Sequence, residues 1–131
     1  MIISTIHFGT SSLSAFFTTA LESRVRYKVG FSYNATEFLD GVTTSAAEFV
    51  EENPDVCLIF FEGDMREHAP TLHAKVRQLL PKAFILWIDY DDNADYDFLE
   101  GDENAALDLF IATGEPWGKL QKALDRIANK L

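Results

Sequence analysis

Hydrophobic positions along the chain follow two different periods. Residues 56–61 and 84–88 are continuously apolar, which is typical of strands that are covered on both faces of a parallel sheet. Residues 13–21 and 70–80 instead repeat apolar side chains every three or four positions, and this spacing predicts helices. A last helix is expected to begin at Pro116. Its apolar face is predicted to carry Trp117, Leu120, Leu124, Ile127 and Leu131.

Shorter patterns predict the remaining strands and helices. Strands are expected at 1–8, 26–33 and 109–112, and a helix at 46–53 that follows a capping box made by Ser45 and Glu48. Strands and helices thus alternate, except that an acidic segment separates the last two strands. This order predicts one α/β domain over residues 1–131, built as a three-layer, doubly wound, five-stranded parallel sheet with a short or irregular fourth helix.

Composition and charge argue against several classes of function and location. A formal charge of −10 would repel a phosphate backbone, so we expect no direct binding of nucleic acid by this domain. Residues 1–21 are uncharged but are interrupted by polar side chains and lack a basic start, which predicts neither a signal peptide nor a membrane span. A cytoplasmic location is therefore expected. The lone Cys57 lies within an apolar run and is predicted to be a buried small hydrophobe.

Three features together resemble a known family. They are Pro54-Asp55 before the apolar run, the order of the five strands, and Glu115-Pro116 at the start of the last helix. They resemble the receiver domains of two-component response regulators over nearly the whole chain. The resemblance implies a flavodoxin-like or CheY-like fold. It also implies an acidic pair that holds Mg²⁺ after the first strand, a phosphate-accepting Asp at the end of the third strand, a Thr or Ser ending the fourth, and a Lys before the last Pro.

The first and third strands depart from that family pattern. His7 and Phe8 stand at the end of the first strand and offer no hard oxygen ligands for Mg²⁺. Aligning Pro54-Asp55 with the family motif places Phe60 at the phosphate-accepting position, and a phenyl ring is not a nucleophile. A shifted register would instead bring Glu62 or Asp64 near the pocket.

The fourth and fifth strands depart from it as well. Ile88 or Asp89 replaces the hydroxyl residue, and Glu115 replaces the lysine. The resemblance therefore implies a degenerate receiver, or pseudo-receiver, that is not an enzyme, needs no cofactor and is not phosphorylated in the usual way. Its expected role is signal transduction or transcription regulation through contacts with a protein partner, an attached output domain or a second copy.

Two other ligands fit parts of the sequence. Oxygen side chains occupy positions 1, 3, 5, 9 and 12 of a calcium-loop pattern: Asp89, Asp91, Asn93, Asp97 and Glu100. A solvated acidic loop is the alternative, because residues 89–108 hold nine acids and no base. Residues 9–14 also resemble the phosphate loop of flavodoxins, which would imply FMN, although helix capping explains the same residues.

Aromatic and histidine side chains have two interpretations each. Tyr90, Tyr96, Phe98 and Trp117 can serve as anchors of a protein interface or can simply pack over the sheet edge. His68 and His73 are five residues apart and do not share a helical face, so we expect solvated surface histidines rather than a metal site.

Overall fold

The computed structural model describes residues 1–8, 17, 19–24, 27–34, 50–61, 66–91, 95–110 and 114–130. Five strands run in chain order: β1 (Ile2–Phe8), β2 (Lys28–Asn34), β3 (Val56–Phe61), β4 (Phe84–Asp89) and β5 (Ala105–Leu109). The labelled helices are α3 (Ala69–Leu79) and α4 (Pro116–Ala128), and two single 3-10 turns are η1 (Arg66–His68) and η2 (Asp97–Leu99). Residues 17 and 19–22 are also helical.

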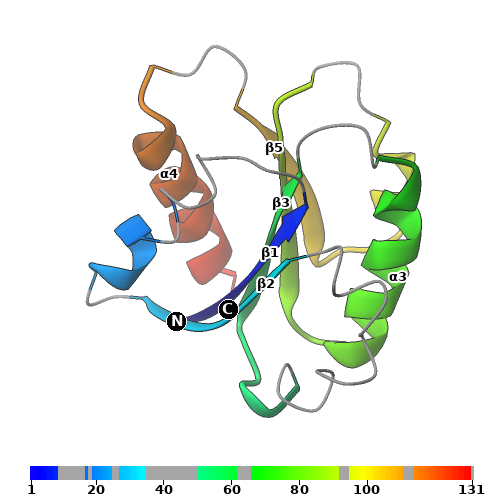
Figure 1. Cartoon of the computed structure of the whole chain (residues 1–131), viewed down its shortest axis with the longest axis horizontal. Helices are drawn as coiled ribbons and strands as arrows, with labels where there is room; N and C mark the ends of the chain where they lie inside the picture. Colours follow the sequence, from blue (N-terminus) through cyan, green and yellow to red (C-terminus); the bar gives the residue numbers. More distant parts are fainter. Residues whose placement is uncertain are drawn as a thin grey trace.

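The strands form one parallel sheet in the order β2-β1-β3-β4-β5. This order confirms the predicted doubly wound, flavodoxin-like architecture. Figure 1 shows α3 and η2 on one face of the sheet, and α4 with the helical residues 17 and 19–22 on the other. The pairing aligns Phe8, Phe61, Asp89 and Leu109 across neighbouring strands, which defines the carboxyl edge of the sheet.

Two hydrophobic cores lie on the two faces of the sheet. Alternate residues of β3 enter different cores, because successive side chains of a strand point to opposite faces. Val56, Leu58 and Phe60 pack toward α4, while Cys57, Ile59 and Phe61 pack toward α3. All six residues of β3 and all six of β4 are buried. The continuous apolar runs were thus predicted correctly as strands that are covered on both faces.

The segment between β4 and β5 holds no α-helix within its described residues, 90–91 and 95–104. It contains only η2, whose Phe98 and Leu99 pack against the α3-side core together with Tyr96. Gly101 then turns the chain with a φ of 86°, a left-handed conformation that favours glycine. The expectation of a short or irregular fourth helix is therefore confirmed.

The fifth strand begins earlier than the sequence predicted. The expected range was 109–112, whereas β5 spans Ala105–Leu109 and residues 111–113 lie outside the described part. The prediction was wrong because Asp108 was counted with the acidic loop. In the structure Asp108 lies on an edge strand, where its carboxylate is 3.6 Å from Arg126 Nη2.

Other predicted elements agree where they are described. α3 begins at Ala69 and carries Pro70 in its first turn, and α4 buries Leu120, Leu124 and Ile127 as expected. The capping box at Ser45 and Glu48 lies outside the described residues. Within the described part of the chain, no helix has the length and apolar content needed to cross a membrane.

Candidate functional site

The carboxyl edge of the sheet is where a receiver would hold its phosphoryl group. The backbones of His7 and Phe8 end β1 at this edge, beside Phe60 and Phe61 of β3. The side chains of His7 and Phe8 lie outside the described residues, as do Glu62 and Asp64.

Phe60 is part of the hydrophobic core rather than of an open pocket. Its side chain is buried, and its ring stacks on Phe17 with 5.5 Å between centroids and 15° between planes. Phe17 in turn meets Phe110 edge-on at 5.4 Å. The position that the receiver resemblance would assign to a phosphate-accepting aspartate is therefore filled by an aromatic packing cluster under α4.

The end of β4 carries a carboxylate that is engaged in the following turn. Asp89 is fully buried, and its carboxylate accepts hydrogen bonds from the backbone N–H of Tyr90 at 2.6 Å and of Asp91 at 3.2 Å. The hydroxyl of Tyr96 donates to the other oxygen at 2.7 Å. The neighbouring Ile88 is buried in the α4-side core. Asp89 thus fixes the start of the β4–β5 connection, as Asp side chains commonly do in turns.

A lysine does reach this edge, although from an unexpected position. Glu115 is exposed at the start of α4. One turn later, Lys119 donates its Nζ to the carbonyl of Leu109 and lies 5.1 Å from the centroid of the Phe110 ring. Sequence reasoning missed Lys119, although its spacing of four from Glu115 places both on one helical face.

The four calcium-loop candidates that the structure describes do not gather at one place. Asp89 and Asp91 share the turn after β4, Asn93 lies outside the described residues, and Asp97 is exposed in η2. Glu100 instead lines a hollow together with Pro81 and Asn104, and these two residues precede β4 and β5. Among the described residues, no three His, Cys, Asp or Glu side chains are arranged to hold a metal ion.

The four candidate interface aromatics are half-buried. Tyr96 and Phe98 pack on Trp87 of β4, each with 5.5 Å between ring centroids. Tyr90 packs against the α4-side core. Trp117 lies under the guanidinium of Arg24, 5.1 Å from the centroid of its ring.

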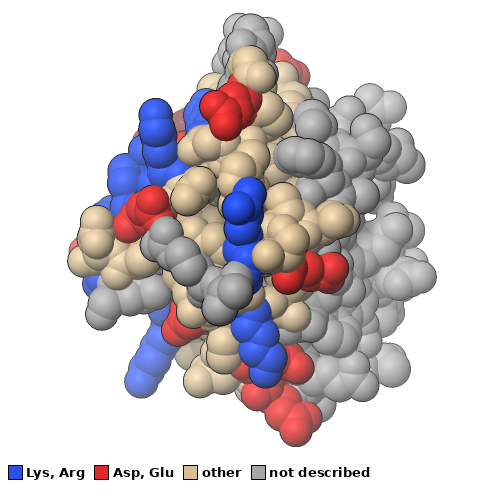
Figure 2. All heavy atoms as spheres, turned by 90° about the vertical axis from the view of Figure 1, so that its left-hand side faces the viewer, with Lys and Arg blue, Asp and Glu red and all other residues tan. Residues whose placement is uncertain are grey.

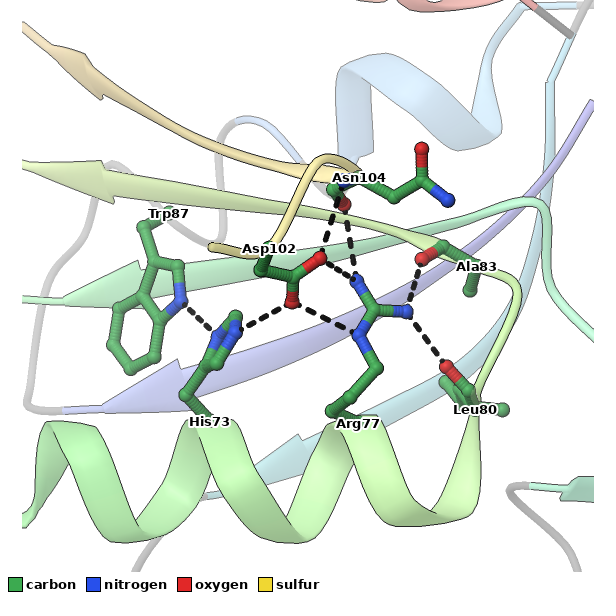
Figure 3. A network of polar contacts seen from close by, with 7 residues as sticks. All are labelled: His73, Arg77, Leu80, Ala83, Trp87, Asp102 and Asn104. Atoms are coloured by element: carbon green, nitrogen blue, oxygen red, sulfur yellow. Dashed lines mark hydrogen bonds and ion pairs between the residues drawn. The ribbon is translucent and has the colours of Figure 1, made fainter. Parts of the chain in front are cut away.

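His73 is the centre of a polar network that the sequence did not reveal (Figure 3). It is buried, so the expectation of a solvated histidine was wrong. Trp87 Nε1–H donates to His73 Nδ1 at 3.0 Å, and His73 Nε2 lies 2.9 Å from Asp102 Oδ2. An indole is only a donor, so Nδ1 must be unprotonated and Nε2 must carry the proton that Asp102 accepts. Both ring nitrogens are engaged, and neither is left to act as a general base.

Arg77, one helical turn after His73, completes the network. Its Nε donates to Asp102 Oδ2 at 2.9 Å and its Nη2 to Asp102 Oδ1 at 3.0 Å, a bidentate pair. The remaining N–H groups reach three backbone carbonyls, those of Leu80, Ala83 and Asn104. All five N–H donors of the guanidinium are therefore satisfied, and they tie the end of α3 to the starts of β4 and β5.

The network also sets the charge of its members. Burial lowers the pKa of His73, and the hydrogen bond and charge of Asp102 only partly oppose this effect. Burial alone would raise the pKa of Asp102, but hydrogen bonds from Arg77 and His73 outweigh it and hold that pKa below its usual value. Neutral His73 and ionised Asp102 follow, in agreement with the tautomer that the geometry requires. A signal for this cluster was present in the i, i+4 spacing of His73 and Arg77 on α3.

Comparison with protein-family models, curated proteins and solved structures finds no match to this chain. Functional argument therefore depends on the fold and on the described side chains.

An open hollow of about 790 Å³ lies beside the network. Glu100 and Glu103 are exposed on its rim, Phe98 is half-buried in its wall, and the engaged His73 and Arg77 form part of its floor. Because every N–H of Arg77 has a partner, this hollow offers no free cation for an anionic ligand. Cys57, the single thiol, is buried, and burial raises its pKa well above the ordinary value. It confirms the prediction of a buried hydrophobe and supplies no nucleophile.

Proposed function

We propose that this chain is a receiver-like, non-enzymatic signalling module that acts through protein contacts without phosphorylation of β3. The five-stranded order β2-β1-β3-β4-β5 supports a receiver-like scaffold. Fold alone does not define function, so the proposal depends on what occupies the carboxyl edge.

The observation that carries the proposal is the burial of Phe60 in a stack with Phe17. An aspartate at this position would place a charge inside an aromatic core, which is costly unless the charge is paired. The carboxylate of Asp89, which ends the neighbouring strand β4, already accepts hydrogen bonds from Tyr90, Asp91 and Tyr96. Phosphoryl transfer to residue 60 or to Asp89 would therefore require the aromatic stack or the hydrogen bonds of Asp89 to rearrange.

The surface near β5 supports a role in binding protein partners. In receivers, partners dock around the fourth helix, the fifth strand and the last helix, and here the fourth helix is replaced by the packed segment 95–104. That segment is held by Asp89 at one end and by Asp102 at the other. The surface therefore has its shape without a phosphoryl group to order it.

The segments before and after Leu109 carry charges of opposite sign. Residues 89–108 hold nine acids and no base, whereas α4 and the two residues after it carry four bases and one acid, Asp125. Figure 2 shows Lys and Arg side chains projecting from the face that α4 covers. A partner or output domain with complementary charges would be steered to one of these two surfaces.

The proposal is tested by incubating the protein with acetyl phosphate and Mg²⁺ and measuring its intact mass. We expect no addition of a phosphoryl group, while a receiver with an ordinary acidic pocket is labelled in the same buffer. A stoichiometric adduct would contradict the proposal. Repeating the reaction with Glu62→Gln and Asp64→Asn would then locate the acceptor.

A further inference from the structure

The outer edge of β5 is an open sheet edge. β5 is the last strand in the order and pairs with β4 along its length without a register shift. All five of its residues are partly exposed. Edge strands are commonly protected by lysine, proline or a bulge, and the sequence Ala-Ala-Leu-Asp-Leu contains neither lysine nor proline.

The backbone of β5 alternates between its two sides. Ile85 N–H donates to Asn104 O, and Phe110 N–H donates to Asp89 O. These two bonds place the backbone groups of residues 104, 106, 108 and 110 toward β4. The backbone N–H and C=O groups of residues 105, 107 and 109 therefore point to the outer edge.

Two of these six outward groups already have partners. Ala105 N–H donates to Asp102 O at 3.3 Å, and Leu109 O accepts from Lys119 Nζ. Four remain without a partner in the described part of the chain: both groups of Leu107, the carbonyl of Ala105 and the N–H of Leu109.

We propose that the β5 edge pairs antiparallel with β5 of a second copy, about a twofold axis at Leu107. The two copies of Leu107 then exchange two hydrogen bonds, as directly opposed residues do in an antiparallel ladder. Leu109 N–H donates to Ala105 O of the second copy, and symmetry repeats this bond. The other two groups that face each other in this register are Ala105 N–H and Leu109 O, and both are already satisfied within one chain. The edge is thus complementary to itself.

The side chains fit the same arrangement. On the α3 side of the sheet, Ala105 would face the larger Leu109 of the second copy, and the two copies of Leu107 would meet at the axis. On the α4 side, Asp108 would face Ala106, so no like charges are directly opposed. Asp108 also keeps Arg126 at 3.6 Å. The pairing is isologous, as expected for a twofold dimer.

Net charge gives the association a recognisable salt dependence. Two molecules that each carry a charge of −10 repel one another, and salt screens that repulsion. Added salt should therefore strengthen this dimer, whereas an interface held by opposite charges would weaken. The inference extends the proposed function to a specific contact, and its test measures no phosphorylation.

Sedimentation velocity over a range of protein and NaCl concentrations tests the dimer, with two variants at the axis. Leu107→Pro removes an outward N–H and leaves the bonds to β4 in place, while Leu107→Ala keeps that N–H and is the matched control. We expect concentration-dependent dimers that salt strengthens. Leu107→Pro should weaken them at least about tenfold because two hydrogen bonds are lost. The alanine variant loses only the contact between the two leucine side chains, so it should weaken the dimer less than the proline variant does.

Amide hydrogen exchange on the wild type tests whether two copies pair through the β5 edge, even if the proline variant fails to fold. The amides of Leu107 and Leu109 should become protected as protein concentration rises, while those of Ala106 and Asp108 are protected at every concentration. A monomer at all concentrations and salt levels would overturn the inference, as would dimers in which the Leu107 and Leu109 amides exchange freely.

Discussion

Trp87 Nε1–H donates to His73 Nδ1 across 3.0 Å, and this bond joins strand β4 to α3. It fixes His73 as the neutral tautomer that donates from Nε2 to Asp102. Asp102 lies in the turn before β5, so three separate parts of the chain meet at one imidazole. The network therefore replaces a regular fourth helix as the device that holds the β4–β5 connection in place.

Substitution of Trp87 by phenylalanine should destabilise the fold. The variant removes the indole N–H and leaves the buried Nδ1 of His73 without its donor, which costs about 1–3 kcal/mol in addition to lost packing. Urea denaturation measures the change in the free energy of unfolding. Trp117→Phe is the control, because Trp117 is half-buried against the α4-side core under Arg24, and its indole N–H donates no hydrogen bond within the described part of the chain. Equal losses in the two variants would contradict the role of the hydrogen bond.

Acidification should destabilise the protein through His73. Burial lowers the pKa of this side chain in the folded state, while the unfolded chain has an ordinary value of about 6.5. The unfolded state therefore binds the proton more readily. This contribution is complete above about pH 6.5 and is lost as the pH falls from there through the lower folded-state pKa.

His73→Gln isolates that contribution. Its amide can accept from Trp87 and donate to Asp102, but it does not titrate. The free energy of unfolding, measured between pH 8 and pH 5, should fall more steeply in the wild type than in this variant. A steeper fall in the variant would show that the folded protein prefers the charged imidazole.

Replacing Arg77 with lysine should be costly despite the retained charge. Lysine cannot reproduce the five-donor fork, so the bidentate bond to Asp102 and most of the carbonyl contacts are lost. We expect a loss of about 2–4 kcal/mol, because Arg77 and Asp102 side chains are only 23% and 19% exposed. Arg126→Lys is the control. Arg126 is 67% exposed and 3.6 Å from Asp108, so this substitution should change the free energy of unfolding by no more than about 0.5 kcal/mol. Thermal or urea unfolding measures the loss in both variants.

Phe60→Ala should behave as a core truncation. Removing a ring that stacks on Phe17 leaves a cavity, and such changes cost about 3–5 kcal/mol. Phe60→Leu should recover most of that loss because it refills the space. If Phe60→Ala were nearly neutral in denaturant titrations, the ring would not be the packing element that the structure shows.

The sequence was most informative where burial is complete. β3 and β4 are covered on both faces, so their side chains are uniformly apolar and the strands could be recognised from that alone. β5 was misplaced because an edge strand is only half-buried and tolerates Asp108. The density of acids in 89–108 concealed a strand that begins inside that range.

The polar network could not be predicted in the same way. Asp102 is one of nine acids in its segment, and nothing in the local pattern distinguishes the one that turns inward. Trp87 lies 14 positions after His73, and Asp102 lies 29 positions after it. Only the fold of the chain brings the three side chains together. The burial of Phe60, by contrast, could be predicted because it lies within a continuous apolar run that forms β3.

The most direct test of the account is a titration of the protein with beryllofluoride and Mg²⁺, followed by ¹H–¹⁵N NMR. Beryllofluoride mimics an aspartyl phosphate, so a working acceptor would shift the amides at the carboxyl ends of β3, β4 and β5. The account predicts an unchanged spectrum at concentrations that saturate an ordinary receiver. Saturable shifts at those strand ends would show an acceptor and contradict the central claim.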